Sequence, residues 1–209
     1  MYEFHKNNKG EYTEGFLGEP ENFNGIVFLL REPNTGGEPA EEFWLKEVLT
    51  NSENYHKALE SSNTDKKKIS NSKRDATKFR KRFSEMLEFI DHKEDDLMNS
   101  VFCNVNPKSG GKTLSKEYKE AMKNGKPQKM ARHFASLKDE ITVFTCVDIY
   151  KKLFESDNTK IDIIEQKKGF IYNRKTLDCF IGKIDNKKIT VYAIYHPSSR
   201  EGEILGTGD

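Results

Sequence analysis

Three polar side chains, each placed at the end of an apolar run, could together act on a bound organic molecule. Glu32 supplies a carboxylate that can orient or deprotonate a water, and Asn104 supplies an amide that can pair with the edge of a flat heterocycle. The imidazole of His196 can stabilise negative charge that develops on a leaving carbonyl oxygen. An aromatic ring that could stack on the heterocycle follows the carboxylate at Phe43 or Trp44. These are the groups needed to cleave an N-glycosidic bond, because that reaction holds a base, absorbs its charge and directs water at the sugar.

Each member of the trio follows a short run that is typical of a buried strand. GIVFLL at 25–30 leads to Glu32, SVFCN at 100–104 ends in Asn104, and KKITVYAIY at 187–195 leads to His196. Ligands of open α/β sheets bind beyond the carboxyl ends of the strands. We therefore expect the three side chains to converge at one edge of a sheet if these strands run parallel.

The remaining patterns predict the framework around these strands. Amphipathic spacing predicts helices at 39–49, 73–91, 126–137 and 147–154, and apolar runs predict a further strand at 141–146 and a hairpin of 177–184 with 187–195, turned at Asp185-Asn186. Alternating strands and helices indicate an α/β protein. We expect a three-layer α/β/α sandwich around a central, mostly parallel four-stranded sheet. It would form a single domain over 1–209, with a polar insertion or loop around 50–72.

Composition limits the cellular setting and the possible cofactors. No apolar run approaches the roughly 20 residues that cross a bilayer, and the first residues lack the apolar core of a secretory signal. The three cysteines are widely spaced and lie beside Val or Phe, which indicates buried free thiols in a reducing, cytoplasmic compartment. They are too few to hold an iron–sulfur cluster, and the histidines show no metal-ligand spacing. We expect neither a metal nor a cofactor. The stretch NPKSGGKT at 106–113 also lacks the first glycine of a phosphate-binding loop.

The net charge of +1 conceals strong local charges that affect the choice of partner. Residues 61–82 carry nine basic and two acidic side chains, and residues 107–129 carry seven and two. Acidic segments offset both of these basic blocks. A single-sign block is most often a solvated face, but two blocks near candidate site residues also fit a surface for nucleic acid.

The order of these motifs resembles the uracil-DNA glycosylase superfamily over roughly residues 25–200. The resemblance is carried by Glu32-Pro33 after the first strand, Asn104 at the end of a middle strand, and His196-Pro197-Ser198 after a late strand. The Phe43-Trp44 pair is similar to a pair that follows the first motif in the mismatch-specific branch.

The resemblance implies a monomeric, metal-independent enzyme that flips uracil or a related damaged base out of DNA and hydrolyses its glycosidic bond. Glu32 would position the water, Asn104 would read the base, and His196 would stabilise the departing anion. Phe43 or Trp44 would stack on the base. Residues that contact the DNA would be Ser198, Ser199, Arg200, Lys108 and Lys112.

Several alternatives remain open at this point. Glu32 could instead pair with Arg31 or cap a helix, and Asn106 rivals Asn104 as the residue that reads the base. Phe43 and Trp44 could be core residues of an amphipathic helix. The chain could also be a non-catalytic nucleic-acid- or partner-binding module on the same fold, or a hydrolase of free nucleosides or nucleotides.

Overall fold

A computed structural model of the chain describes residues 15, 20–32, 57, 71–106, 114–154, 161–172 and 175–194. Within these ranges, the side chains of residues 20, 71–76 and 168–177 are not described. None of the helices in the described ranges is long and apolar enough to cross a membrane.

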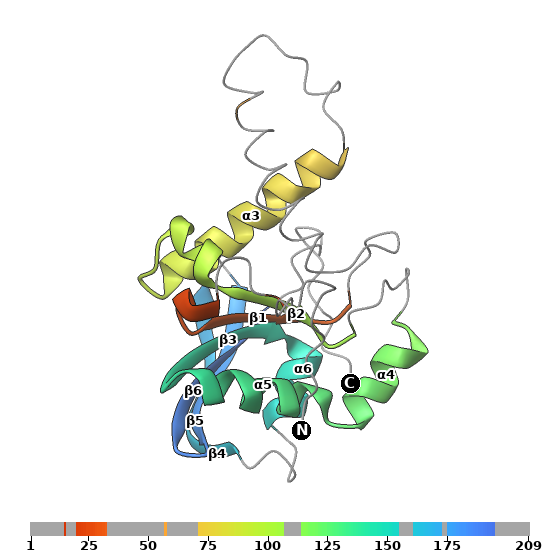
Figure 1. Cartoon of the computed structure of the whole chain (residues 1–209), viewed down its shortest axis with the longest axis vertical. Helices are drawn as coiled ribbons and strands as arrows, with labels where there is room; N and C mark the ends of the chain where they lie inside the picture. Colours follow the sequence, from red (N-terminus) through yellow and green to blue (C-terminus); the bar gives the residue numbers. More distant parts are fainter. Residues whose placement is uncertain are drawn as a thin grey trace.

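One six-stranded sheet organises the described residues (Figure 1). Its strands are β1 (Ile26–Leu30), β2 (Val101–Asn104), β3 (Glu140–Cys146), β4 (Ile161–Tyr172), β5 (Lys175–Ile184) and β6 (Lys187–Ile194), in the spatial order β2-β1-β3-β6-β5-β4. The first four strands of that order are mutually parallel, whereas β5 and β4 are antiparallel. The α/β class and the mostly parallel sheet are therefore confirmed.

The expectation of four strands is wrong, because the sheet has six. The parallel part alone has four strands, and an antiparallel pair extends it beyond β6. The sequence pattern missed β4 because its pairing with β5 is irregular between Ile163 and Glu165 and again between Lys167 and Phe170. Such bulges interrupt the two-residue alternation by which a strand is recognised.

Four aromatic rings form a row across the parallel strands on one face of the sheet. Phe28 stacks on Phe102 of β2 with centroids 4.4 Å apart, and on Phe144 of β3 at 5.4 Å. Phe144 in turn stacks on Tyr192 of β6 at 5.2 Å. The row follows the ladder register, because parallel partners point to the same face.

Helix α3 (Asn71–Phe89) covers this aromatic row. Its Phe83 meets both Phe28 and Phe102 edge-on, each with centroids 4.7 Å apart, and Phe89 meets Tyr192 edge-on at 5.6 Å. Edge-to-face contacts of this kind add to the free energy gained by burying the rings. The predicted helix at 73–91 is confirmed, and its apolar side packs on the sheet.

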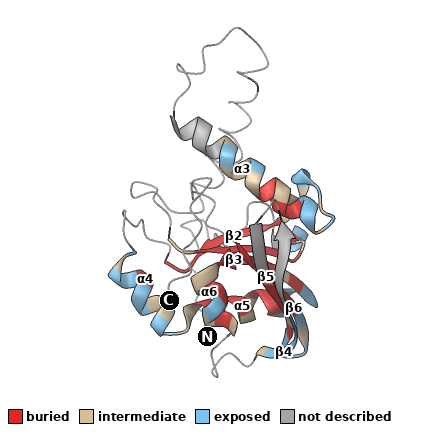
Figure 2. Cartoon of the chain, turned by 180° about the vertical axis from the view of Figure 1, so that it is seen from behind, coloured by how far each residue is buried: buried red, intermediate tan, exposed pale blue. Residues whose placement is uncertain are grey.

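Helices α5 (Lys126–Leu137) and α6 (Val147–Phe154) lie on the opposite side of the sheet from α3 (Figure 1). Both confirm the predicted helices at 126–137 and 147–154. On this side Tyr150 and Phe154 of α6 pack against Phe180 of β5. Burial is concentrated in the four parallel strands β1, β2, β3 and β6 and in the sides of the helices that face them (Figure 2).

Three short helical elements were not predicted from the sequence. Helix α4 (Lys116–Lys123) and the 3-10 helix η4 (Glu94–Asn99) are short and largely polar, so they carry little periodic signal. A further 3-10 turn, η1, spans Pro20–Asn22. The helix predicted at 39–49 lies outside the described residues.

The turn between β5 and β6 has the backbone that its sequence predicts. Asp185 and Asn186 both adopt positive φ, 48° and 67°. A two-residue hairpin turn with both central residues in this region matches the right-handed twist of the strands, and Asp and Asn tolerate it better than most residues.

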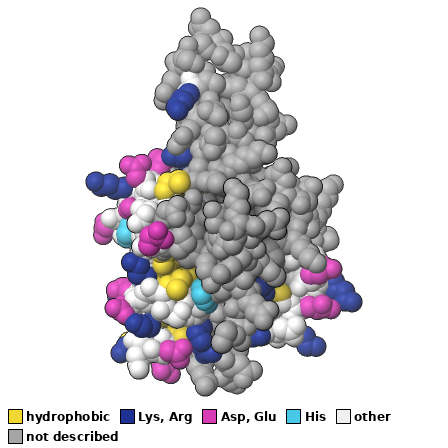
Figure 3. All heavy atoms as spheres, in the orientation of Figure 1, with side chains coloured by type: hydrophobic (Ala, Val, Ile, Leu, Met, Phe, Trp, Pro, Cys, Tyr) yellow, Lys and Arg dark blue, Asp and Glu magenta, His cyan; other side chains and the backbone are white. Residues whose placement is uncertain are grey.

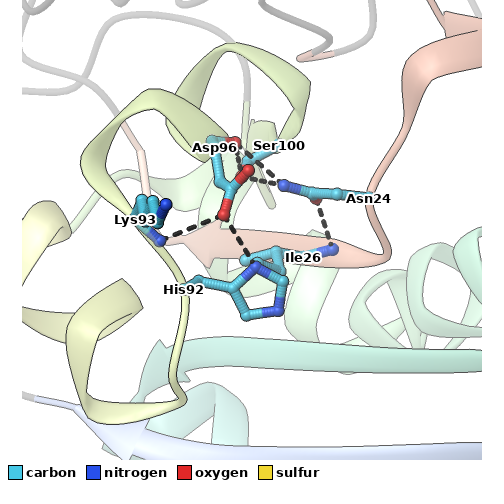
Figure 4. Close-up of polar contacts among 6 residues, drawn as sticks. All are labelled: Asn24, Ile26, His92, Lys93, Asp96 and Ser100. Atoms are coloured by element: carbon cyan, nitrogen blue, oxygen red, sulfur yellow. Dashed lines mark hydrogen bonds and ion pairs between the residues drawn. The ribbon is translucent and has the colours of Figure 1, made fainter.

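A hydrogen-bonded cluster fastens the entry to β1 onto η4 (Figure 4). The Asn24 side chain donates to the Asp96 carbonyl at 2.8 Å and to Ser100 Oγ at 3.2 Å, and it accepts from the Ile26 N–H at 3.0 Å. The Asp96 carboxylate accepts from the Lys93 N–H at 3.0 Å and contacts His92 Nδ1 at 3.0 Å. This cluster lies at the amino end of β1, away from the carboxyl edge where the candidate residues are expected.

Candidate functional site

The carboxyl ends of the parallel strands bring Glu32 and Asn104 to the same edge of the sheet. Leu30 is paired with Asn104 in the β1–β2 ladder, and Glu32 follows Leu30 by two residues. β3 and β6 run in the same direction, with Cys146 paired to Ile194 at their carboxyl ends. The three strands β1, β2 and β6 therefore run parallel, as the predicted convergence requires. His196 itself lies outside the described residues.

Glu32 is held by three hydrogen-bond donors. Its Oε1 accepts from the Ser115 N–H at 2.9 Å. Its Oε2 accepts from Ser115 Oγ at 2.5 Å and from Asn106 Nδ2 at 3.0 Å. Ser115 is also the N-cap of α4, because its Oγ accepts from the Tyr118 N–H at 3.0 Å. The carboxylate thus joins the end of β1, the chain after β2 and the start of α4.

These hydrogen bonds favour the ionised form of Glu32. Partial burial acts in the opposite direction, but the donors from Ser115 and Asn106 outweigh it and lower the pKa of Glu32. A carboxylate has about four lone-pair positions, and the described donors occupy three of them. Oε1, which accepts only one of these bonds, retains a position for a further donor such as a water.

Asn104 and Asn106 have different surroundings, which separates the two candidates for base recognition. The amide of Asn106 is committed to Glu32 and also donates to Ser115 Oγ at 3.1 Å. Asn104 is only 4% exposed, and its Nδ2 has no hydrogen-bond partner within the described part of the chain. Because an unpaired buried amide is costly, this nitrogen is the better candidate for a ligand contact.

A second polar cluster at the same edge was missed by sequence reasoning. Arg31 Nε lies 3.0 Å from Oδ1 and 3.1 Å from Oδ2 of Asp148, in the first turn of α6. Tyr118 of α4 donates its hydroxyl to Asp148 Oδ2 at 2.7 Å. Arg31 therefore pairs with Asp148 rather than with Glu32, and α4 and α6 are tied to the end of β1.

Burial and charge shift the titration of the groups in this second cluster. Burial opposes ionisation of Arg31, but the negative partners around it, Asp148 among them, raise the pKa of the guanidinium. Burial and the bond to Asp148 raise the pKa of Tyr118 well above its ordinary value, so its hydroxyl stays a donor. The buried Cys146 thiol, with its pKa raised to about 12 mainly by burial, stays protonated at neutral pH.

No signal local to Ser115, Asp148 or Tyr118 indicated these roles. Ser115 precedes a short helix that the apolar pattern did not predict, and its bond to Glu32 spans 83 positions of the chain. A serine just before a helix is a common N-cap, but this local signal does not predict which distant residue the serine contacts. Asp148 was predicted only as part of a helix.

Most of the other predicted site residues lie outside the described residues. These are Phe43, Trp44, Lys108, Lys112, His196, Ser198, Ser199 and Arg200. All three cysteines are buried and free, as predicted. Within the described ranges, no group of three or more His, Cys, Asp or Glu side chains is arranged to hold a metal ion.

The described parts of the two basic blocks lie on different sides of the sheet. Block 61–82 ends in α3, whereas block 107–129 includes α4 and the first turn of α5. Basic and acidic side chains alternate over the described surface in Figure 3, and ion pairs such as Lys81–Glu85 and Lys116–Glu120 reduce the local excess of charge. The blocks therefore do not form one continuous basic face in the described part of the chain.

Comparison of the chain with protein-family models, with curated proteins and with solved structures found no match.

Proposed function

We propose that this protein is a DNA glycosylase that hydrolyses the N-glycosidic bond of uracil or a related damaged base. The observation that carries the proposal is the anchored carboxylate of Glu32, which keeps an acceptor position at the edge of the sheet where Asn104 ends the adjacent strand. The three-layer α/β/α arrangement expected of such an enzyme is supported by α3 on one side of the sheet and α5 and α6 on the other.

Each proposed role uses the chemistry of its side chain. Glu32 orients a water whose oxygen bonds to the sugar C1′ while the bond from C1′ to the base breaks. The electron pair of the broken bond leaves on the base, and the proton that the water loses passes through the Glu32 carboxylate to the base anion. A lowered pKa suits this role, because the carboxylate stays ionised and favours the positive charge that develops on the sugar. Asn104 pairs with the base edge, and His196, two residues beyond the end of β6, stabilises the departing anion.

The proposal also requires the base to leave the DNA stack. Phe43 or Trp44 would stack on the flipped base. Ser198, Ser199, Arg200, Lys108 and Lys112 would contact the DNA, where each phosphate contact adds salt-dependent affinity.

Uracil release from oligonucleotides tests this function directly. The protein is incubated with single- and double-stranded uracil-containing oligonucleotides, and alkali-labile abasic sites are counted. We expect Glu32→Gln and His196→Ala each to reduce release by at least about 100-fold, because orienting and proton-transfer groups contribute about 10² to 10⁴ in rate. Glu21→Gln, which removes an exposed acid from η1, is the matched control and should leave release unchanged. Absence of release from uracil, hypoxanthine and mismatched-thymine substrates would contradict the proposal.

A non-catalytic nucleic-acid-binding module is the second candidate, and one observation favours it. The three donors to Glu32 also make it a brace between β1 and α4, a role that needs no chemistry. This candidate predicts salt-dependent DNA binding with no abasic product. A nucleoside or nucleotide hydrolase would instead turn over monomers and bind oligonucleotides weakly, so the same assay with free nucleosides separates the three.

A further inference from the structure

The side chain of Arg31 has hydrogen-bond donors that no described part of the protein uses. A guanidinium carries five N–H donors, one on Nε and four on the two Nη atoms. Every side-chain contact of Arg31 within the described residues involves Nε, which lies 3.0 Å from Oδ1 and 3.1 Å from Oδ2 of Asp148. Because 27% of the side chain is accessible, Arg31 can offer the donors on Nη1 and Nη2 to a bound molecule.

The guanidinium of Arg31 is held by a partner that is itself held. Asp148, in the first turn of α6, also accepts from the hydroxyl of the buried Tyr118 at 2.7 Å. Because Nε is the tethered atom, Nη1 and Nη2 form the free end of the planar group, and two parallel donors of this kind match the oxygens of a phosphate. A side chain that is already ordered loses less conformational entropy when it binds a ligand.

Arg31 directly precedes the candidate catalytic carboxylate of Glu32, and consecutive Cα atoms lie only about 3.8 Å apart. Glu32 contacts the start of α4, and the same helix supplies the Tyr118 hydroxyl to the Arg31–Asp148 pair. In the proposed function Glu32 directs water at C1′ of a sugar, and the phosphates of a nucleotide are attached to that sugar. A cation next to the carboxylate is therefore suitably placed for one of these phosphates.

The local balance of charge is compatible with an anion beside Glu32 and Asp148. Asp148 lies in the first turn of α6, and Glu32 accepts from the N-cap of α4. Each helix N-terminus carries about half a positive charge, which offsets part of the negative charge of the carboxylate beside it. The Cys146 thiol and the Tyr118 hydroxyl have raised pKa values and add no negative charge. The guanidinium of Arg31, which stays protonated, therefore still attracts an anion.

A buried amide at the end of the adjacent strand also lacks a partner. Asn104 pairs with Leu30 in the β1–β2 ladder, one residue before Arg31. It is buried, and its Nδ2 has no hydrogen-bond partner in the described part of the chain. Because buried polar groups are normally paired, unused donors at the ends of two neighbouring strands indicate a ligand that supplies several acceptors. The base and the phosphate of a nucleotide supply them.

We propose that Arg31 binds a phosphate group of the substrate beside Glu32, and that Asp148 and Tyr118 are positioning residues that hold the guanidinium. This site rests on the proposed function, because it takes the substrate to be a nucleotide unit, but it does not depend on catalysis. The same chemistry fits a phosphodiester of DNA and the phosphate of a free nucleotide, and the choice of probe separates these two sources.

Fluorescence anisotropy of the full-length protein with a labelled single-stranded oligothymidylate, repeated over a series of salt concentrations, tests the site without any uracil. We expect Arg31→Gln to weaken binding by about 10- to 150-fold, the value of one hydrogen bond to a charged group. It should also flatten the plot of log affinity against log salt by about 0.7, the contribution of one single-strand phosphate contact. Tyr118→Phe breaks the bond to Asp148 without removing a charge, so it should weaken binding less and leave the slope unchanged. A purely structural role for Arg31 predicts that the two variants behave alike.

Replacing single linkages by neutral ones identifies the phosphate. The oligonucleotide carries one 2′-fluoro-2′-deoxyuridine, whose fluorine opposes positive charge on the sugar and so blocks cleavage, and a methylphosphonate replaces each neighbouring linkage in turn. At the linkage that Arg31 contacts, the replacement should weaken the wild type by about the same factor as Arg31→Gln and should have little further effect on that variant. If Arg31→Gln does not fold, Arg31→Lys takes its place: it keeps the charge but lacks the planar fork, so it should lose less than the wild type at that linkage.

Calorimetric titration with deoxyuridine 5′-monophosphate and with deoxyuridine tests a free nucleotide as the source of the phosphate. If the monophosphate binds at least about 10-fold more tightly than the nucleoside, and this difference disappears in Arg31→Gln, the ligand is a free nucleotide. If the effect of Arg31→Gln is confined to the oligonucleotide, the ligand is a phosphodiester of DNA. Both results support a phosphate site at Arg31.

Arg132→Gln is the matched control, because it also removes an arginine that forms an ion pair. Arg132 lies 3.3 Å from Asp185 in the turn before β6, at the amino end of that strand, and its loss should leave the salt slope unchanged. The phosphate site is overturned if Arg31→Gln keeps the wild-type slope, if Arg132→Gln flattens the slope equally, or if the wild type binds neither the oligonucleotide nor the monophosphate. A circular dichroism melt of each variant verifies that it is folded.

The two proposals fail in different ways. Binding that depends on Arg31 without uracil release contradicts the glycosylase and leaves the phosphate site. Uracil release with binding that is unaffected by Arg31→Gln contradicts the phosphate site alone.

Discussion

At the scale of single residues, Ser115 both caps a helix and holds the candidate catalytic carboxylate. Its hydroxyl caps α4 by accepting from Tyr118 and at the same time donates to Glu32 at 2.5 Å. The orientation of the candidate catalytic carboxylate therefore depends on the first turn of a short helix. A substitution at this serine should change both stability and the titration of Glu32.

We expect Ser115→Ala to destabilise the protein by about 1–3 kcal/mol at pH 7, because it removes a helix cap and a donor to a charged group. Urea denaturation measures the change. Ser136→Ala serves as the control, since this exposed serine bonds only the His133 carbonyl within its own helix, and it should cost less than about 0.5 kcal/mol.

The same variant should respond to pH in a defined direction. The folded pKa of Glu32 is depressed, so its contribution is fully present above the unfolded value of about 4.3 and is lost as the pH falls through the folded pKa. The stability difference between wild type and Ser115→Ala should therefore narrow under acid conditions. A difference that stays constant down to pH 2 would contradict the proposed link to Glu32.

At the scale of elements, the outer edge of β2 is contacted by a residue far upstream. The Phe102 N–H donates to the Gly15 carbonyl at 2.6 Å, and Gly15 is buried with φ of +78°. A Cβ at Gly15 would lie 2.0 Å from the Phe102 carbonyl oxygen. Covering an edge strand in this way also protects its backbone groups from pairing with another chain.

We expect Gly15→Ala to reduce the free energy of unfolding by about 2 kcal/mol or more, because both the backbone conformation and the backbone contact oppose a side chain. Gly125→Ala provides the comparison. Gly125 has a similar φ of +69°, but an added Cβ would meet only the side chain of Gln128, with Oε1 at 3.4 Å and Cδ at 3.9 Å, so the loss should be about 1 kcal/mol. Equal losses in a urea titration of the two variants would show that the Phe102 contact has no effect.

The elements differed in how readily the sequence predicted them. β1 is a continuous apolar run and β3 is a largely apolar one, as is typical of buried strands, and the β5–β6 turn carries its own Asp-Asn signal. β4 is an end strand with an exposed surface and two irregularities, so its period is broken. The alternation of apolar and polar residues reflects which side chains are buried, so it does not reveal a strand that is largely exposed.

At the scale of the whole molecule, partial burial of a histidine makes stability sensitive to mild acid. His133 in α5 is half-buried, and this burial lowers its pKa to about 4. The unfolded chain, with a value near 6.5, binds the proton more readily. The contribution of His133 to stability is therefore present above about pH 6.5 and is lost as the pH falls toward 4.

We expect the wild type to lose more stability between pH 7 and pH 4 than His133→Gln, which lacks the titrating ring. Thermal unfolding at several pH values measures this difference. Parallel pH profiles for wild type and His133→Gln would contradict the assignment.

The sequence by itself determined the α/β class, the strands that carry Glu32 and Asn104, and the placement of both residues at strand ends. These features follow from local sequence, because the spacing of apolar residues indicates the type of element and its buried face. Only the tertiary structure decided that Ser115 and Asn106 hold Glu32, that Arg31 pairs with Asp148, and that the described parts of the basic blocks lie on different sides of the sheet. These contacts join residues between 74 and 117 positions apart. They depend on how segments far apart in the chain pack together, and a local sequence pattern does not predict such contacts.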